Sequence, residues 1–421
     1  MSVSFCRCQC KMCRAPGVRH CTGHPSCGAP PLGRELRPVL TAVPRRPDEQ
    51  EVVFAMRRLR AESGSHAPSV AQIERAIPRL VQVDACFLSN PYATTEVMTR
   101  LLAVPAPRWE QMLAHYPSQA SVIAATVAPH LGVPAENLHL ANGACEVIQA
   151  LLADGCGPML ISMPTFSAYY EFAQGPVVAQ QLDPRADFRL DLHELEARVN
   201  RHSPETVVII NPNNPDGGLI PHAELVGFLG RVHTKVHQVI VDESFSHFAT
   251  EATPETAAGL VAEFPELVVV NSLSKSYGIP GLRLGYAVMS AQRAKALHDR
   301  SLWNLNALAE WFATLLCDPE FQQAYERARR RYVRDTRTLF ADLDTLPGAR
   351  AFPSAANFAL LKLDRTAPEV TSALLARHGV YVRDCADKRG LHDGHRFIRV
   401  AARSQHENRR TPCAMSSASE R

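Results

Sequence analysis

The stretch L-V-V-V-N-S-L-S-K-S-Y-G-I-P-G-L-R-L-G-Y, residues 267–286, joins an apolar run to a polar segment with one lysine and one arginine. The run L-V-V-V is typical of a strand that is buried on both faces of a parallel sheet. Outward from it, the order of apolar run, turn residues and amphipathic helix recurs from residue 137 onward. This alternation predicts an α/β fold, in which a three-layer αβα domain contains a mostly parallel sheet.

Polar residues follow each of these apolar runs directly. In open α/β sheets the ligand crevice lies beyond the carboxyl ends of the strands. We therefore expect five polar strand ends to converge on one ligand: Asn142-Gly143, Pro164-Thr165, Asn211 to Pro215, Asp242-Glu243, and Ser272 to Lys275.

The pattern changes near residue 302, where a long helical stretch is followed by short strands around one further helix. This change predicts a large domain over residues 84–302 and a smaller α+β domain from residues 51–83 and 303–407. Residues 408–421 show no periodicity, so an irregular tail is expected there.

The N-terminal segment differs from the rest of the chain. Residues 1–46 carry eight basic residues and one acidic residue, and six of the twelve cysteines lie among the first 27 residues. A zinc site is one interpretation, but the paired C-x2-C spacing of structural sites is missing, so a disordered extension over residues 1–50 is favoured. The scattered remaining cysteines indicate a reducing compartment, and we expect a cytoplasmic protein. The net charge of +3 and the lack of long apolar runs favour neither a nucleic-acid partner nor a membrane, and no metal site is expected.

Lys275 and Asp242 are the residues that point to chemistry. A lysine amine attacks carbonyl groups when its surroundings lower its pKa, and its commonest cofactor partner is then pyridoxal phosphate. The hydroxyls of Ser272 and Ser274 and the guanidinium of Arg283 suit a phosphate. Asp242 follows an apolar strand, where a carboxylate needs a charged partner such as a protonated pyridine nitrogen. The alternatives are a solvated loop lysine and a structural ion pair.

Three further segments fit the same cofactor. Asn214 could donate to the phenolic oxygen of the ring, although N-P-N-N-P-D-G-G is also a turn sequence. The backbone N–H groups of Gly143, Ala144 and Cys145 open a helix after a strand and could bind the phosphate. Phe166 could lie over the pyridine ring or belong to the core.

Taken together, these segments resemble in order and spacing the fold-type I pyridoxal-phosphate enzymes of the class I/II aminotransferase superfamily. Within it, the sequence most resembles the branch of histidinol-phosphate aminotransferase and threonine-phosphate decarboxylase. The resemblance covers residues 84–408, and S-x-S-K-x-x-x-x-x-G-x-R-x-G is its most specific motif. It implies that Lys275 is the Schiff-base lysine, Asp242 the pyridinium partner and Asn214 the ligand of the phenolic oxygen. Phe166 is then the stacking aromatic, and Ser272, Ser274 and Arg283 bind the phosphate.

The same resemblance implies substrate-binding residues and an oligomeric state. Arg399 matches an arginine that binds an acid group of the substrate, and Arg383 matches a second anion-binding arginine. Asn90 and Tyr92 match the N-terminal substrate loop. Tyr116 resembles a tyrosine that reaches the cofactor phosphate of a neighbouring subunit, which implies a homodimer with shared sites.

Phe245 departs from the usual aminotransferase pattern, in which tyrosine stands three residues after the aspartate. The decarboxylase branch has phenylalanine there. The resemblance implies a transaminase that moves an amino group between an amino acid or phosphorylated amine and a 2-oxo acid, with an amino-acid decarboxylase as the alternative. A regulatory protein of the same fold is disfavoured because residues 1–50 show no helix-turn-helix pattern, and a damaged gene copy is a third possibility.

Overall fold

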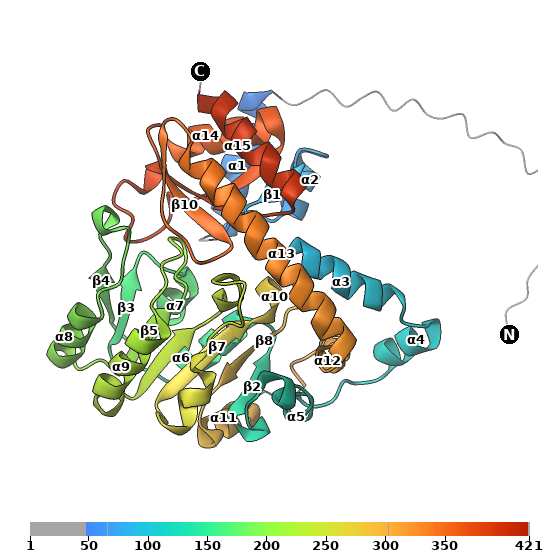
Figure 1. The fold of residues 1–421 in the computed structure, drawn as a ribbon, viewed down its shortest axis with the longest axis vertical. Helices are drawn as coiled ribbons and strands as arrows, with labels where there is room; N and C mark the ends of the chain where they lie inside the picture. Colours follow the sequence, from blue (N-terminus) through green and yellow to red (C-terminus); the bar gives the residue numbers. More distant parts are fainter. Residues whose placement is uncertain (1–47, 65, 302, 420–421) are drawn as a thin grey trace, which may run out of the picture. The chain divides into compact units, whose positions relative to one another are not determined.

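The computed structural model describes residues 48–64, 66–301 and 303–419 (Figure 1). The predicted N-terminal extension and its cysteines lie outside the described residues, apart from residues 48–50, where Asp48 caps the first helix. Residues 47–421 form one compact unit that contains two sheets. In the described part of the chain, no helix is both long and apolar enough to cross a membrane.

The larger sheet has seven strands in the order β2-β8-β7-β6-β5-β3-β4. Strands β3 to β7 pair in parallel, and β8 is antiparallel to both of its neighbours. Their bounds are Leu138–Ala141 (β2), Met159–Met163 (β3), Val177–Gln181 (β4), Thr206–Ile210 (β5), Gln238–Asp242 (β6), Leu267–Ser272 (β7) and Gly285–Val288 (β8).

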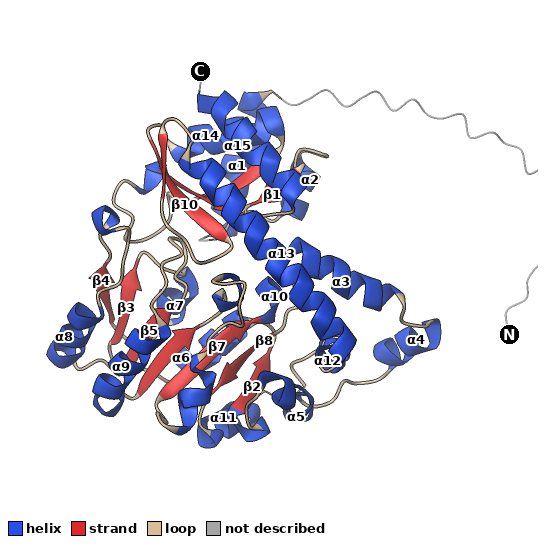
Figure 2. Ribbon diagram, viewed as in Figure 1, coloured by secondary structure: helices blue, strands red, loops and turns tan. Residues whose placement is uncertain are grey.

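Helices cover both faces of this sheet, as Figure 2 shows. Side chains alternate between the two cores along β5, where Val207 and Ile209 pack on one face and Val208 and Ile210 on the other. The first face carries α5 (Ala120–Leu131), α8 (Leu192–His202), α9 (His222–Val232) and α12 (Ala307–Leu316). The second carries α6 (Ala144–Leu152), α7 (Ser167–Phe172) and α11 (Ala291–His298). The predicted three-layer α/β fold with a mostly parallel sheet is confirmed.

The smaller sheet has the order β1-β11-β12-β10-β9 and completes the predicted α+β part. Its strands are Val83–Ala85 (β1), Ala349–Ala351 (β9), Phe358–Leu363 (β10), Val380–Asp384 (β11) and Phe397–Ala401 (β12). The other helices are Glu49–Ser63 (α1), Val70–Ala76 (α2), Pro91–Leu102 (α3), Ala106–Ala114 (α4), Leu273–Ser276 (α10), Pro319–Asp344 (α13), Ala367–Ala373 (α14) and Gln405–Ser419 (α15).

Two expected boundaries fall elsewhere in the structure. Asp84, the expected start of the large domain, lies inside β1 and pairs with Tyr381 of the smaller sheet. Helix α12 lies beyond residue 302, yet Phe312 packs in the core of the larger sheet. The long helix α13 contributes to both cores, since Phe321 packs with the larger sheet and Tyr332 with the smaller one.

The expectation of an irregular tail over residues 408–421 is wrong for the described residues up to 419, which form most of α15. The backbone N–H of Ser404 donates to the carboxylate of Glu407 at 3.1 Å and so satisfies one N–H group at the start of the helix. Ala414 and Met415 are buried in the core of the smaller sheet. Tertiary packing therefore stabilises a helix whose composition, with Pro412 inside it, gave no such signal.

Candidate active site

A cavity of about 380 Å³ lies where residues of both sheets meet. Its wall includes residues that follow the carboxyl ends of β5, β6 and β7, as expected for a parallel sheet. Most of the predicted site residues are in this wall: Ala144, Cys145, Phe166, Asn214, Asp242, Ser272, Lys275, Arg283, Arg383 and Arg399.

Lys275 lies in the short helix α10, directly after β7. Burial, reinforced by the positive charge of Arg399, lowers the pKa of its amine from 10.5 to about 8. A substantial fraction of the amine is therefore neutral near pH 8, as a lysine that reacts with an aldehyde requires. The backbone also fixes this helix, because the carbonyl of Lys275 accepts a hydrogen bond from the N–H of Asn90 at 3.1 Å.

Asp242 ends strand β6 and is almost completely buried. The Tyr169 hydroxyl donates to its carboxylate at 2.9 Å, and the backbone N–H of Ser244 donates at 2.9 Å. Burial nevertheless raises the pKa of Asp242. Within the described residues it forms no ion pair at salt-bridge distance, so a cation bound beside it would favour its charged form. Tyr169 was not expected here from the sequence, because it lies 73 positions away along the chain.

The segment around Arg283 forms a close-packed cradle at the start of α6. Gly143 has φ +85°, and a Cβ there would lie 2.5 Å from a guanidinium nitrogen of Arg283. A Cβ on Gly285 would lie 2.4 Å from the backbone nitrogen of Ala144. The buried hydroxyl of Ser274 has no hydrogen-bond partner among the described residues. A guanidinium, a helix N-terminus and an unpaired buried hydroxyl together fit a phosphate group.

Asn214 and Arg399 are joined, since the guanidinium of Arg399 donates to the Asn214 side-chain oxygen at 2.6 Å. Arg399 also donates to the carbonyl of Cys86 at 3.1 Å, while its Nε has no partner in the described chain. Burial lowers the pKa of this guanidinium. Arg383 on β11 pairs with Asp387 at 2.6 Å.

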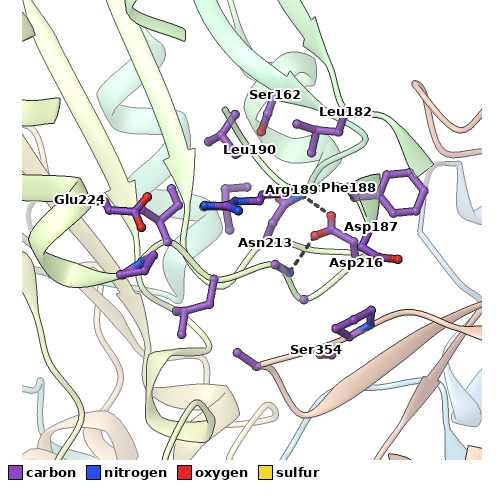
Figure 3. A pocket seen from close by; sticks show the side chains of 18 residues that line it. Ser162, Leu182, Asp187, Phe188, Arg189, Leu190, Asn213, Asp216, Glu224 and Ser354 are labelled. Carbon is purple, nitrogen blue, oxygen red and sulfur yellow. Dashed lines mark hydrogen bonds between the residues drawn. The ribbon is translucent and has the colours of Figure 1, made fainter. Parts of the chain in front are cut away.

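A second polar network holds the loop that carries Asn214, and Figure 3 shows two of its members, Asn213 and Asp216. The Asn213 amide donates to the Pro164 carbonyl at 3.0 Å and to Asp216, and the Thr165 hydroxyl donates to Asn213 at 2.9 Å. Asp216 also accepts from the N–H of Gly218 at 2.7 Å and borders a separate cavity of about 330 Å³. Burial raises its pKa to about 7. From the sequence this stretch was expected to be a turn beside Asn214, and the bonds of Asp216 were not expected. An aspartate directly before two glycines is nevertheless typical of a side chain that bonds the backbone of its own turn.

Five predicted residues are not in the cavity wall: Gly143 and Ser274, which belong to the cradle described above, and Asn90, Tyr92 and Tyr116. The Tyr92 hydroxyl donates to Asp335 at 2.5 Å, and the side-chain oxygen of Asn90 caps helix α3. Tyr116 is 89% exposed and lies beside Trp303, with 5.9 Å between ring centroids. Conversely, His66 and Lys388 line the cavity and were not identified from the sequence.

The comparisons with known proteins agree with this geometry. Residues 111–411 match the family model described as aminotransferase class I and II. The chain belongs to this family. An L-serine phosphate decarboxylase of Campylobacter jejuni is 37% identical over 372 residues, which cover 86% of this chain and 95% of that protein. A solved decarboxylase structure from Sulfurospirillum multivorans has a TM-score of 0.82 at 36% identity and covers 88% of this chain and 96% of that one. A histidinol-phosphate aminotransferase of Bacillus licheniformis is 31% identical over 304 residues, covering 70% of this chain and 80% of that protein.

Pyridoxal 5'-phosphate is the cofactor of this family, and the site fits it. In such a complex Lys275 would meet the aldehyde, and the carboxylate of Asp242, which has no ion-pair partner in the described chain, would meet the ring nitrogen. The cradle of Gly143, Ser274 and Arg283 suits the phosphate.

Proposed function

We propose that this protein is a decarboxylase of a phosphorylated amino acid, with O-phospho-L-serine as the first candidate substrate. The observation that carries the proposal is the 37% identity to an L-serine phosphate decarboxylase over 95% of that protein. The products would be CO2 and ethanolamine phosphate. From the sequence, decarboxylation was the alternative to transamination, and the relatives favour decarboxylation.

The positively charged side of the cavity supports decarboxylation of a phosphorylated substrate as the first candidate. Arg383, Lys388 and Arg399 all line it, and the positive charges of Arg383 and Arg399 contribute to lowering the pKa of Lys388. Three neighbouring cations suit one dianion, such as a phosphomonoester. If the phosphate of the substrate lies in this cluster, the three cations bind the end of the substrate that is remote from Cα. None of them would then hold the α-carboxylate, so the bond between this carboxylate and Cα would be free to break.

Each residue has a proposed role in this reaction. The cofactor, when bound, withdraws the electron pair that is released at the substrate Cα. Asp242 would keep the ring nitrogen protonated, and Tyr169 and Ser244 hold that carboxylate in place. Asn214 would orient the ring, and Phe166 would cover it. Lys275, whose amine can take up and release a proton near pH 8, would return a proton to Cα where CO2 has left.

Phe245 is also consistent with decarboxylation. Its side chain lines the cavity but packs edge-on against Phe358, with 5.0 Å between ring centroids. Phe245 would bring no hydroxyl to the cofactor ring, unlike the tyrosine expected at this position in an aminotransferase.

Transamination is the second candidate, supported by the 31% identity to a histidinol-phosphate aminotransferase. The same residues would serve it if Arg399 held the α-carboxylate near the plane of the ring. The Cα–H bond would then break, and Lys275 would move the proton.

We also propose a homodimer in which Tyr116 serves the neighbouring site. Large apolar side chains are exposed along residues 98–122, and Leu113 is 85% exposed. Tyr116 is exposed too and does not line the cavity of its own chain. Sedimentation equilibrium of the holoenzyme would give the dimer mass, and a monomer at micromolar concentration would contradict the proposal.

A substrate panel tests the reaction. The holoenzyme would be incubated with O-phospho-L-serine, O-phospho-L-threonine, L-serine or histidinol phosphate, each with 2-oxoglutarate, while CO2 and glutamate are measured. We expect CO2 from O-phospho-L-serine, little from L-serine, and none with Lys275→Ala. Glutamate without CO2 would refute the decarboxylase proposal and support the second candidate.

A further inference from the structure

Lys388 lies in the connection of residues 385–396 between β11 and β12. Turn hydrogen bonds shape this loop. The N–H of Lys388 donates to the carbonyl of Cys385 at 3.0 Å, and the N–H of Leu391 donates to the carbonyl of Lys388 at 3.3 Å. The backbone on either side of the lysine is thus fixed within the loop itself.

The same loop is anchored on the larger sheet. Gln181, at the end of β4, donates from its side chain to the Gly390 carbonyl at 2.5 Å. The guanidinium of Arg389 lies over the ring of Tyr170 in α7, 5.0 Å from its centroid. Gly390 has φ +84°, and a Cβ there would lie 2.7 Å from the Cβ of Met163. These contacts hold the loop beside the strand end that leads to Phe166, so Lys388 is carried by a constrained backbone.

Within the described chain, the ammonium group of Lys388 has no ion-pair partner, although its side chain is largely buried. The residue is only 8% exposed and lines the cavity. Among the residues that the structure describes, it has neither an ion-pair partner within 4.0 Å nor a side-chain hydrogen bond. The nearby Asp387 is already bonded to Arg383 at 2.6 Å. A buried and unpaired charge is costly, and such costs are typical of functional sites.

A count of the charges in the wall shows what could pair with it. The bound cofactor would engage Lys275 through its aldehyde, Arg283 through its phosphate and Asp242 through its ring nitrogen. Arg383 forms an ion pair with Asp387. Arg399 donates only to uncharged oxygens, those of the Asn214 side chain and the Cys86 carbonyl. The remaining excess of positive charge lies at Lys388 and its two arginine neighbours, which suits a ligand group with two negative charges.

We propose that Lys388 is a specificity-determining residue that binds the distal phosphate of the substrate. This inference rests on the proposed function for the identity of the substrate, but the phosphate contact itself can be tested without turnover. Burial and the positive charges of Arg383 and Arg399 lower the pKa of the Lys388 amine to about 8, and a phosphate between these groups would restore its charge.

Calorimetric titration of the holoenzyme with two amines tests the contact. Ethanolamine phosphate carries the phosphate and ethanolamine does not, while both present the same amine to the cofactor. We expect Lys388→Met to weaken binding of ethanolamine phosphate about 10- to 100-fold, the usual range for a charge-assisted hydrogen bond, and to leave ethanolamine within about twofold. Lys388→Arg keeps the charge and should retain most of the affinity. Lys362→Met is the control, because Lys362 is a partly exposed lysine of β10 that does not line the cavity. It should leave the affinity for both amines unchanged.

Two results would overturn the assignment: affinity for ethanolamine phosphate within about twofold of the wild type in Lys388→Met, or an equal loss of both amines. The proposed function is judged separately, by CO2 release from O-phospho-L-serine. Weaker phosphate binding in Lys388→Met supports the role of Lys388 even if the wild type releases no CO2. Conversely, CO2 release with unchanged affinity in Lys388→Met leaves the decarboxylase standing and refutes the role of Lys388.

Discussion

Replacing Lys275 by methionine should make the cofactor-free protein more stable at neutral pH. Lys275 is largely surrounded by protein, and its pKa falls from 10.5 in the unfolded chain to about 8 in the folded one. A difference of that size corresponds to about 3 kcal/mol of unfolding free energy, since one pKa unit is about 1.4 kcal/mol. Methionine has a similar length and is uncharged, so burying it does not carry this cost.

The sign of the effect follows from proton binding. Below pH 8 the folded and unfolded chains both carry the ammonium form, and the folded chain bears the full cost of burying it. Between pH 8 and 10.5 the folded chain releases its proton first, so the cost falls as pH rises. The attraction between Lys275 and Asp242 affects the pKa of either group less than burial does, so losing it offsets only part of the gain.

Urea unfolding of the apoprotein at pH 7, 8.5 and 10 measures this directly. We expect Lys275→Met to be more stable than the wild type by up to about 3 kcal/mol at pH 7, with the gain shrinking toward pH 10. Lys295→Met is the control, because Lys295 is exposed and pairs with Asp299 on the surface. A Lys275→Met protein no more stable than the wild type at pH 7, or a gain that does not depend on pH, would refute the reasoning.

Three further substitutions test the site. Asp242→Asn cannot hold the ring nitrogen as a charged pair, so kcat for decarboxylation should fall at least about 100-fold while absorbance titration still shows bound cofactor; activity within about tenfold of the wild type would count against its role. Gly143→Ala would place a Cβ 2.5 Å from Arg283 at φ +85°, so cofactor affinity measured by fluorescence titration should fall about tenfold or more, and unchanged affinity would contradict the cradle. Burial raises the pKa of Asp216 to about 7, so the wild type should lose stability between pH 4 and 7, where the carboxyl ionises only in the unfolded chain. Asp216→Asn has no such group and should become more stable relative to the wild type over this range. A difference in thermal midpoints that does not change with pH would argue against this.

The sequence was informative where function depends on strand ends. Asp242 and Lys275 each follow an apolar strand, and parallel strands bring their carboxyl ends to one edge of the sheet, so their convergence could be predicted. Arg283 could be assigned to the phosphate end of the site because it stands at a fixed spacing from Lys275 in the same sequence motif.

The sequence was uninformative where position depends on contacts between distant segments. Lys388 reaches the cavity because its loop is anchored on Gln181 and Tyr170, about 200 residues earlier in the chain. Tyr169 meets Asp242 only through the packing of α7 against the sheet. Helix α15 is stabilised by the side chains that it buries, a tertiary effect that local composition does not reveal.

The most direct test of the proposed function follows the carboxyl carbon of the substrate. The holoenzyme would be mixed with O-phospho-L-serine labelled with ¹³C at the carboxyl carbon, in the presence of 2-oxoglutarate, and the products followed by ¹³C and ³¹P NMR. The proposed function predicts that the label appears as bicarbonate and that ethanolamine phosphate forms in equal amount. Retention of the label in a phosphorylated 2-oxo acid, together with glutamate, would contradict it.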